Sequence, residues 1–410
     1  MGVRPLRILW TMPYLPWPIT SGGKARQFHL LRCMAARGHH ITLLVQSKTE
    51  ADAEVRAALA PFVKELIVLP RRALRHPVTL CHAALSRLPL LATVNGHAPA
   101  LSARFESLLQ RQAWDVVQIE HSYGLQPFIG ALRRHAQPFV LVEHNVESEL
   151  GAATYGKWPR WSRPLARYDQ WRARRWERQA LSHASVVVAV TDGDARTLGR
   201  ISGRPTCVVS NGVDTRGFAE VTPDARSQNV LFVGNYEYAP NLDAVEWALE
   251  AVWPRIWARC PQARFVVCGH ALPASWRERW PDPRIEWRGY VRSLTEVQSQ
   301  CALFLAPLRS GGGSKLKVLE ALAASLPVIS TREGLSGLDV QDGVQARVAD
   351  TAEAMAQAVV DLLRHPTQAH ALGQAARAHV TRHFDWDAAA LELEAAYAHL
   401  PAGQQGVACA

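Results

Sequence analysis

Short apolar segments alternate with amphipathic ones through the first half of the chain. The segment KARQFHLLRCMAARG (24–38) places Phe28, Leu31 and Ala35 on one helical face and ends at Gly38. Continuous apolar strands separated by such helices predict a parallel sheet that is covered on both faces. The predicted strands are RILWTM (7–12), HITLLV (40–45), ELIVLP (65–70), DVVQIEH (115–121), FVLVEH (139–144) and SVVVAVT (185–191).

The same alternation restarts in the second half, after an Asn-Gly turn signal at Asn211-Gly212. A long helix is predicted over roughly 241–259. The predicted strands are NVLFVG (229–234), RFVVCGH (264–270), RIEWRGYV (284–291), CALFLAPL (301–308) and PVIST (327–331). We therefore expect an α/β protein with two Rossmann-like domains, 1–207 and 208–384, whose parallel sheets face each other across a cleft. We also expect a helix over about 385–402 to pack back on the first domain.

Composition narrows the classes of partner. The formal net charge of +10 over 410 residues indicates an anionic partner, such as a nucleotide, a nucleic acid or an acidic membrane surface. A high-GC genome also enriches arginine, so the charge alone does not choose among them. The seven cysteines form no C-x-x-C pair, which argues against structural zinc and a disulfide framework. With no secretory or membrane-spanning run, we expect a cytoplasmic protein.

The segment LRSGGGSKLKVLEALAASLPVIST (308–331) leads from a predicted strand through a glycine-rich loop into a predicted helix. Ser314 is the candidate N-cap of that helix. Free N–H groups at a helix N-terminus attract anions, and glycines let the backbone approach an anion closely. Lys315 and Lys317 add full positive charges, so the pattern predicts a site for a diphosphate. The loop glycines are Gly311, Gly312 and Gly313.

Glu320 follows this loop at a distance that suits a ribose. Six residues beyond Ser314 is roughly 9 Å along a helix, and helical side chains lean back toward the N-terminus. A carboxylate there can accept two hydroxyl hydrogen bonds, which predicts a nucleotide-diphosphate site. Two other interpretations stay open: a plain glycine loop, or a simple ion pair between Glu320 and Lys317. The loop is not a Walker A motif, because Leu316 follows Lys315.

Together with VVSNGVD (208–214) and NVLFVG, this segment resembles the retaining group 1 (family 4) glycosyltransferases of the GT-B fold. The resemblance covers nearly the whole chain. It implies that the C-terminal domain binds a nucleotide-sugar donor and the N-terminal domain binds the acceptor. The family carries two glutamates eight positions apart. Glu320 matches the second, which binds ribose, while the first, which contacts the transferred sugar, falls at Gly312. The chain therefore resembles a variant with a Gly-Gly-Gly-Ser-Lys donor loop.

A second departure concerns charge near the donor phosphates. The family's arginine and lysine after the first strand of the donor domain fall at Asn235 and Pro240. We hypothesise that Lys315 and Lys317 replace these charges. The resemblance implies catalytic roles for Lys315 and Glu320 and places the base near 289–292. The implied donor contacts are Gly22, Gly23, Gly234, Asn235, Tyr290, Val291, Gly311, Gly312, Gly313, Ser314, Lys315, Lys317 and Glu320.

In the N-terminal half, the candidate residues follow predicted strands. Gly22 and Gly23 start a helix and match family glycines near the donor phosphates and sugar, although they also suit a simple helix cap. His121 ends a strand and matches the catalytic histidine beside the transferred sugar, although a lone histidine there is often structural. His144 and Asn145 end the next strand and are expected on the acceptor side. Two nearby carboxylates, Glu143 and Glu147, are weaker candidates.

The stretch KWPRWSRPLARYDQWRARRWER (157–178) combines eight basic residues, two acidic ones and four tryptophans. This mixture suits a helix lying on an anionic membrane, which would fit a lipid-linked acceptor. It equally suits an ordinary surface helix whose tryptophans pack inward. Nucleic acid is a poorer interpretation, because no recognised binding motif accompanies the charge.

These observations predict a glycosyltransferase that moves a sugar from a UDP- or GDP-linked donor to an acceptor hydroxyl. The acceptor is expected to be a glycan, a lipid-linked glycan or another glycoconjugate in polysaccharide biosynthesis, with retention of configuration. We expect no cofactor, no metal and no nucleic-acid partner, and a location in the cytoplasm or on the inner face of its membrane. Two rival functions stay open: a nucleotide-sugar epimerase of the same fold, and a noncatalytic nucleotide-sugar-binding protein.

Overall fold

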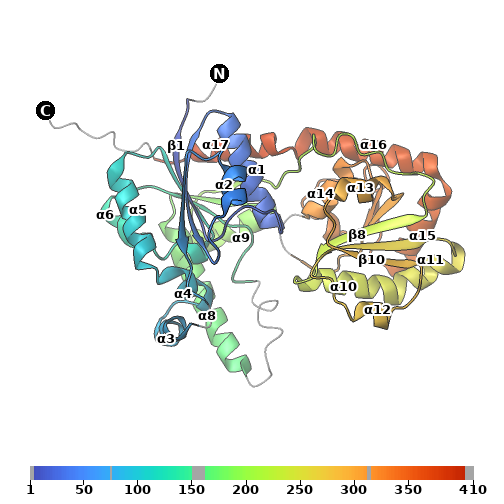
Figure 1. The fold of residues 1–410 in the computed structure, drawn as a ribbon, viewed down its shortest axis with the longest axis horizontal. Coiled ribbons are helices and arrows are strands. Elements are labelled where there is room, and N and C mark those ends of the chain that lie inside the picture. The colour runs from blue at the N-terminus through green and yellow to red at the C-terminus, as the bar shows by residue number, and fades with distance from the viewer. Residues whose placement is uncertain (1–3, 74–75, 150–161, 312–314, 402–410) are drawn as a thin grey trace. The chain divides into compact units, whose positions relative to one another are not determined.

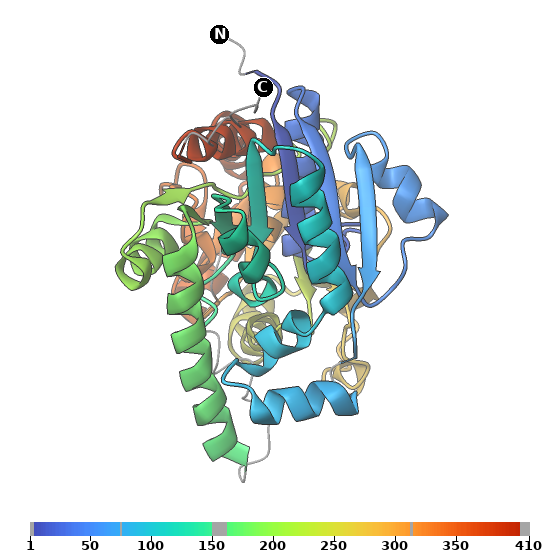
Figure 2. The same cartoon turned by 90° about the vertical axis from the view of Figure 1, so that its left-hand side faces the viewer.

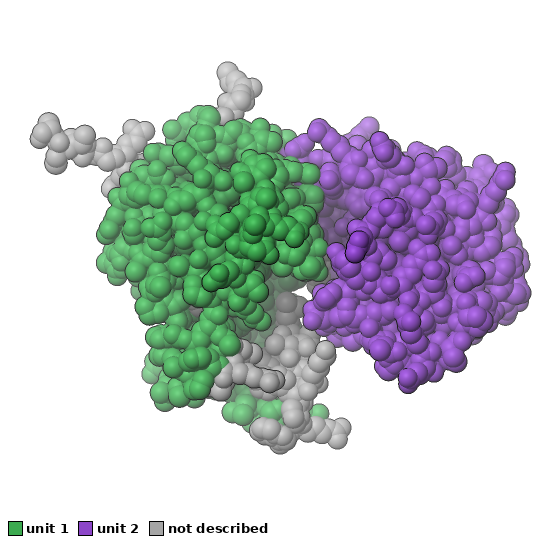
Figure 3. Space-filling view, in the orientation of Figure 1, with its two compact units in different colours: residues 1–210, 389–410 green, residues 211–388 purple. Residues whose placement is uncertain are grey.

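The computed structural model describes residues 4–73, 76–149, 162–311 and 315–401 (Figure 1). The chain packs as two compact units. The first contains residues 1–210 and 389–410, and the second contains residues 211–388 (Figure 3). The second unit is thus inserted in the sequence of the first.

The first unit is built on a seven-stranded parallel sheet in the order β3-β2-β1-β4-β5-β6-β7. Its buried side chains include Leu9, Val117, Leu141 and Val187, which are completely enclosed between sheet and helices. The strands are β1 (Arg7–Met12), β2 (His40–Ser47), β3 (Glu65–Pro70), β4 (Val116–Glu120), β5 (Val140–Val142), β6 (Val186–Ala189) and β7 (Thr206–Val208). The helices are α1 (Gly22–Ala36), α2 (Ala53–Leu59), α3 (Pro77–Leu85), α4 (Leu90–Gly96), α5 (Pro99–Arg111), α6 (Ile129–Arg134), α8 (Arg163–His183) and α9 (Asp192–Ser202), with a short 3-10 turn, η1 (Ser122–Gly124).

The second unit repeats this plan with a six-stranded parallel sheet in the order β10-β9-β8-β11-β12-β13. Its strands are β8 (Asn229–Asn235), β9 (Arg264–His270), β10 (Ile285–Gly289), β11 (Leu303–Ala306), β12 (Val328–Ser330) and β13 (Arg347–Val348). Its helices are α10 (Ala239–Trp247), η3 (Ala248–Val252), α11 (Trp253–Arg259), α12 (Trp276–Arg279), α13 (Leu294–Ser299), α14 (Leu316–Ala323), α15 (Ala352–Arg364) and α16 (Pro366–His383), with a 3-10 turn, η4 (Glu333–Leu335). The predicted class, two Rossmann-like units with parallel sheets, is confirmed.

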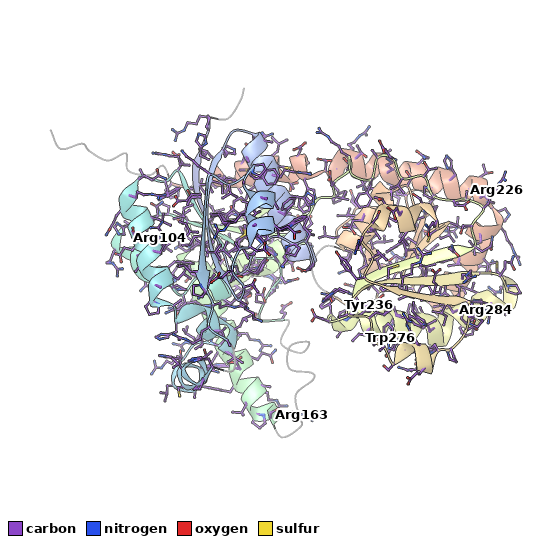
Figure 4. The ribbon with its side chains drawn as sticks, viewed as in Figure 1. Arg104, Arg163, Arg226, Tyr236, Trp276 and Arg284 are labelled. Atoms are coloured by element: carbon purple, nitrogen blue, oxygen red, sulfur yellow. The ribbon has the colours of Figure 1, made fainter. Side chains whose placement is uncertain are left out.

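The long helix predicted over 241–259 is interrupted in the middle. It runs as α10, a π-helical turn (η3) and α11, with Pro254 in the first turn of α11. Proline has no N–H to donate to the preceding turn, and such local rearrangements are a common response. An aromatic group that includes Trp276 and Tyr236, shown in Figure 4, packs edge to face with ring centroids 5.4 Å apart in the same unit.

The last helix, α17 (Trp386–Tyr397), begins in the second unit and ends in the first. Glu394 accepts two hydrogen bonds of 2.7 Å from the Arg37 guanidinium at the end of α1. His39 Nε2 lies 2.7 Å from the same carboxylate. The hydrogen bonds from Arg37 and His39 outweigh burial and lower the pKa of Glu394. A charged, bidentate contact therefore fastens the end of the chain to its beginning. None of the helices within the described ranges is long and apolar enough to span a bilayer.

Gly269 on β9 is required because it lies opposite Gly234 of the neighbouring parallel strand β8 with no room for a side chain. Its φ is +137°, and a Cβ atom there would lie 1.7 Å from the carbonyl oxygen of Gly234 on β8. We predict that Gly269→Ala lowers the free energy of unfolding by ~3 kcal/mol or more, because backbone atoms cannot move away without breaking strand pairing. Urea denaturation followed by circular dichroism measures this loss.

Gly343→Ala is the matched control, since Gly343 has a φ of +75° with open space around it. It should cost only about 1 kcal/mol, the strain of a left-handed backbone. Equal losses in the two variants would show that steric overlap at Gly269 is not the cause.

Candidate functional site

The carboxyl ends of β8 and β11 and the start of α14 meet in the second unit. A Cβ atom on Gly311 would lie 3.3 Å from the Tyr238 hydroxyl, and one on Gly234 would lie 3.2 Å from Asn241 Cβ. The amide of Asn241 donates to the backbone carbonyl of Asn235 at 2.7 Å. The loop after β8 and the loop after β11 are therefore packed together by glycines that leave no room for side chains.

Lys317 extends from α14 onto the loop after β8. Its ammonium donates to Asn241 Oδ1 and lies 4.8 Å from the centroid of the Phe232 ring. Burial and then the neighbouring Lys315 lower the pKa of Lys317 to about 7. Lys317 thus contacts Asn241, which follows Pro240 and donates to the carbonyl of Asn235; Pro240 and Asn235 are the two positions where the resemblance expects basic residues.

Lys315 is buried at the beginning of the same helix. Its ammonium donates to the carbonyl oxygen of Gly311 at 2.6 Å and lies 3.3 Å from Glu333 Oε1. The residue occupies the N-cap position of α14 and makes no side-chain cap bond, so the helix begins one residue later than predicted. The candidate cap Ser314, with Gly312 and Gly313, lies outside the described residues, so these predicted contacts stay predictions.

Glu320 lies on α14 three residues beyond Lys317. Its carboxylate has no hydrogen bond or ion pair with any described residue, so the simple pair with Lys317 is not formed. Burial raises the pKa of Glu320 to about 7, and the charge of Lys317 opposes the rise. This half-buried carboxylate, with no side-chain partner among the described residues, is able to accept hydrogen bonds from a ligand.

Tyr290 and Val291 directly follow β10, on the same edge of the sheet as the loops above. Gly289 ends that strand with a φ of +66°, which turns the chain. The Tyr290 side chain is 65% exposed, whereas Val291 packs against the core. An exposed aromatic ring at this edge is available for stacking on a base.

In the first unit, His121 stands in a strained conformation at the end of β4. Its φ is +63°, which is rare for a residue with a Cβ atom and is often tolerated at functional sites. Its Nε2 lies 3.1 Å from the Tyr14 hydroxyl, and its ring stacks on Tyr123 with centroids 4.7 Å apart. The ring of His144, at the end of β5, lies 4.3 Å away. Two predicted histidines are thereby brought together.

Gly23 allows α1 to approach this pair of histidines. A Cβ atom there would lie 3.0 Å from the Tyr14 hydroxyl and 3.5 Å from His144 Nδ1. Gly22 only begins the helix, which is capped by the Ser21 hydroxyl accepting from the Lys24 N–H. The helix cap is thus observed, while the contacts of Gly22 and Gly23 with the donor phosphates and sugar stay predictions. Asn145, next to His144, is half-buried.

Glu120 orients His144 from inside the sheet. Its carboxylate accepts hydrogen bonds from Trp10 Nε1 at 2.7 Å and from Gln118 Nε2 at 2.6 Å, and it lies 3.1 Å from His144 Nε2. Burial alone would raise the pKa of Glu120, but hydrogen bonding from His144 helps to lower it. Burial and the nearby His121 lower the pKa of His144 to about 4. A neutral His144 then carries its proton on Nε2, and Nδ1 is left as an acceptor facing α1.

The network continues to the end of the chain. Gln118 accepts a hydrogen bond from the Tyr397 hydroxyl of α17. Both side chains are buried, at 0% and 5% exposure. The helix that returns to the first unit thus supports, through Gln118 and Glu120, the orientation of His144.

One group of side chains in the described ranges has the composition of a cation site. Ligand atoms of His121, Glu143 and Glu147 lie within 4.8 Å of one another. Burial, followed by the charges of Glu147 and Glu177, raises the pKa of Glu143 well above its ordinary value, so a proton also satisfies this cluster. The expectation that no metal is needed stays a prediction.

Tyr14, Gln27 and Glu120 contact the candidate histidines but were not among the predicted site residues. Tyr14 lies in the Pro-rich loop after β1, and Gln27 Nε2 lies 3.2 Å from His144 Nε2. Only Glu120 carried a signal in the sequence, as a charged residue at the end of a mostly apolar strand. Such a residue must find buried partners, and they come from its own strand, from β1 and from the residues after β5.

We predict that Glu120→Gln lowers the free energy of unfolding by ~2–4 kcal/mol. The new amide N–H₂ is itself a donor, so it cannot accept the hydrogen bonds that the carboxylate accepted. Urea denaturation measures the change. Glu106→Gln in the same unit is the control, since its partner Arg134 is 60% exposed, and it should cost less than about 1 kcal/mol. A similar cost for both substitutions would contradict a special role for the buried network.

Two family models match the chain, one in each unit. The model described as "Glycosyltransferase Family 4" matches residues 21–216. The model described as "Glycosyl transferases group 1" matches residues 227–365. These ranges contain the predicted site residues of the first and second units.

Curated and solved proteins are similar over most of their length. A protein named glycogen synthase from Mycobacterium tuberculosis is 24% identical over 98% of this chain and 96% of its own. The structure of Anabaena Alr3699/HepE in complex with UDP and glucose superposes with a TM-score of 0.68 at 14% identity, covering 96% of this chain and 99% of that one. The structure of sucrose-phosphate synthase from Thermosynechococcus elongatus superposes with a TM-score of 0.69 at 17% identity, covering 96% of this chain and 98% of that one. With a matching family model in each unit and solved structures that share the architecture of both, the chain is a group 1 glycosyltransferase of the GT-B fold.

Proposed function

We propose that the protein transfers a sugar from a nucleotide-diphosphate sugar to an acceptor hydroxyl with retention of configuration, in the assembly of a polysaccharide or another glycoconjugate. The observation that carries this proposal is that one helix, α14, holds both the ammonium of Lys317 and the carboxylate of Glu320, which forms no ion pair with a described residue. The two groups suit a diphosphate and a ribose.

The diphosphate is proposed to bind at the beginning of α14. Lys315 and Lys317 supply positive charge there, and the N–H groups of the first helical turn add partial positive charge. Lys315 is already held by the Gly311 carbonyl and Glu333, so it needs no large rearrangement to bind an anion. When the sugar departs, negative charge grows on the leaving diphosphate, and these fixed charges stabilise it.

The nucleoside is proposed to extend from Glu320 toward Tyr290. The free carboxylate oxygens of Glu320 can accept both ribose hydroxyls, and the exposed Tyr290 ring can stack on the base. UDP is the first nucleotide to test, because solved structures of the same fold contain it: HepE with UDP-glucose and S. aureus TarM with UDP.

The first unit is proposed to bind the acceptor and to contact the transferred sugar. His121 has the strained backbone and the aromatic neighbours of a fixed contact residue. His144, held neutral by burial, offers Nδ1 as an acceptor for a sugar hydroxyl, with Asn145 beside it. The similarity to a protein named glycogen synthase supports a glycan acceptor, and a lipid-linked glycan belongs to the same class. We place the enzyme in the cytoplasm or on the inner face of its membrane.

Two alternative functions stay open, and a specific observation supports the first of them. Gly312 stands where related enzymes have a glutamate at the transferred sugar, which favours a protein that binds a nucleotide sugar without transferring it. An epimerase of this fold would instead convert the nucleotide sugar without an acceptor. Release of free nucleotide diphosphate separates transfer or hydrolysis from simple binding.

We predict that one member of a panel of UDP- and GDP-linked sugars raises the melting temperature of the protein and slowly yields free nucleotide diphosphate. Lys315→Ala and Glu320→Ala should each weaken binding of that donor more than tenfold, over ~1.4 kcal/mol, because each removes a direct contact. Thermal shift titrations measure binding, and a nucleotide assay measures release.

Arg226→Ala is the control, since it removes a positive charge from an exposed position of the second unit. Its donor affinity should equal that of the wild type. Binding without release would favour the noncatalytic alternative, and binding that Lys315→Ala and Glu320→Ala leave unchanged would overturn the assignment of the site.

We also predict that the donor binds with uptake of a proton at pH 8. With a pKa of about 7, Lys317 is mostly neutral at this pH, and a bound diphosphate raises its pKa and protonates it. Glu320, also with a pKa of about 7, is already mostly ionised, so ribose binding exchanges few protons there. The diphosphate of a nucleotide sugar does not itself titrate in this range.

Calorimetry of the bound donor in Tris and in HEPES measures this uptake, because the two buffers release protons with different enthalpies. The uptake should approach one proton in the wild type, persist in Glu320→Gln and disappear in Lys317→Met. Identical binding enthalpies of the wild type in both buffers would refute the prediction.

A further inference from the structure

Exposed apolar side chains are concentrated at one end of the first unit. Of the ten large hydrophobic side chains exposed in the described ranges, six lie on three neighbouring helices, α3, α4 and α8. Leu85 is the most exposed, at 88%. The six are Val78, Leu85, Leu91, Leu165, Tyr168 and Trp171. Such a concentration marks a surface that binds something, because scattered exposed residues need no explanation but a patch does.

Polar contacts hold the three helices as one surface. The Arg172 guanidinium on α8 donates to the carbonyl oxygens of Ala83 and Ser86, at 2.8 and 3.0 Å. Asp169, one turn earlier, accepts from the N–H of Leu90 at 3.0 Å and pairs with Arg172 at 2.5 Å. Figure 2 shows α3 (light blue) beside the lower part of α8 (green) and running away from it. The helices that carry the exposed apolar side chains are therefore fixed to one another.

The exposed charge on this surface is entirely positive. The two acidic residues of α8, Asp169 and Glu177, are buried, and 77–96 contains no acidic residue. Figure 4 shows Arg163 at the tip of α8 that lies farthest from the sheet. Arginine side chains also cover the aromatic rings, with Arg172 4.9 Å from the centroid of Tyr168 and Arg175 5.9 Å from that of Trp171. The exposed arginines are Arg87, Arg163, Arg167, Arg174, Arg175 and Arg178.

We propose that α3, α4 and the first half of α8 form a docking surface for an anionic lipid bilayer. Aliphatic and aromatic side chains enter the boundary between headgroups and acyl chains, while arginines bind the anionic headgroups. The absence of exposed acidic side chains on the described part of these helices matches the negative charge of such a surface. The surface holds the enzyme on the membrane without spanning it.

The residues proposed to contact the membrane differ from those that the sequence of 157–178 alone indicates. Of the four tryptophans between 157 and 178, Trp171 is 54% exposed, and Trp176 is buried in the core at 5%. Trp158 and Trp161 lie outside the described residues. Half of the exposed apolar set comes instead from α3 and α4, whose sequence is uncharged except for histidine and the connecting Arg87.

The test is sedimentation of the full chain with vesicles of phosphatidylcholine, with and without phosphatidylglycerol. Wild type should bind the anionic vesicles at least about tenfold more tightly than the neutral ones, and added salt should weaken this binding. The double variant Leu85→Glu and Trp171→Glu should lose at least about tenfold in affinity for the anionic vesicles.

A charge-matched control carries Val344→Glu and Leu391→Glu, at positions that are 46% and 52% exposed away from these helices. It should bind vesicles as the wild type does. Melting curves and donor titrations of all variants, recorded without vesicles, should coincide, so failure of the membrane proposal is distinguishable from failure of the proposed function.

Three results would overturn the proposal. One is no sedimentation with anionic vesicles, and another is equal loss of binding in the control variant. The third is a dimer in light scattering without vesicles that the Leu85 and Trp171 substitutions abolish, which would assign this surface to a protein contact.

Discussion

The buried carboxylate of Glu120 is the constraint on which the first unit depends. An ionised group at 1% exposure is stable only if donors surround it, and here they come from Trp10 on β1, from Gln118 on its own strand and from His144 after β5. The three donors fix the register of neighbouring strands and the proton position of His144 together. The hydrogen bonds of Glu120 therefore both position His144 and stabilise the sheet.

In the second unit, by contrast, two charged side chains of α14, Lys317 and Glu320, form no ion pair with a described residue. Lys317 is drawn toward neutrality and Glu320 toward protonation, because both are removed from water without forming an ion pair. The proposed ligand, with negative charge at one end and hydroxyl groups at the other, would give Lys317 a counter-charge and Glu320 hydrogen-bond donors. Electrostatic contacts are stronger at a poorly solvated site than in water, so these contacts would gain from the same burial.

The local sequence predicts the strands of both sheets well and the buried polar network poorly. Runs such as NVLFVG and CALFLAPL are apolar enough to be buried on both faces, so the strands they predict are present, whereas the two- and three-residue strands β13 and β7 carry no such signal. Tyr14 could not be predicted as a neighbour of His121, nor Tyr397 as a partner of Gln118, because each reaches its partner from a segment far away in sequence. The lysines and Glu320 were recognisable because a single helix carries them all.

The return of α17 to the first unit has a consequence for synthesis. The ribosome makes the chain from its N-terminus, so β1 to β7 emerge long before Glu394 and Tyr397, which hold Arg37, His39 and Gln118. The first unit must wait, with these polar groups unsatisfied, until the inserted residues 211–388 have been translated. A nascent chain that stops early therefore contains a second unit that is whole in sequence and a first unit that is not. Assembly of the first unit therefore depends on completion of nearly the entire chain.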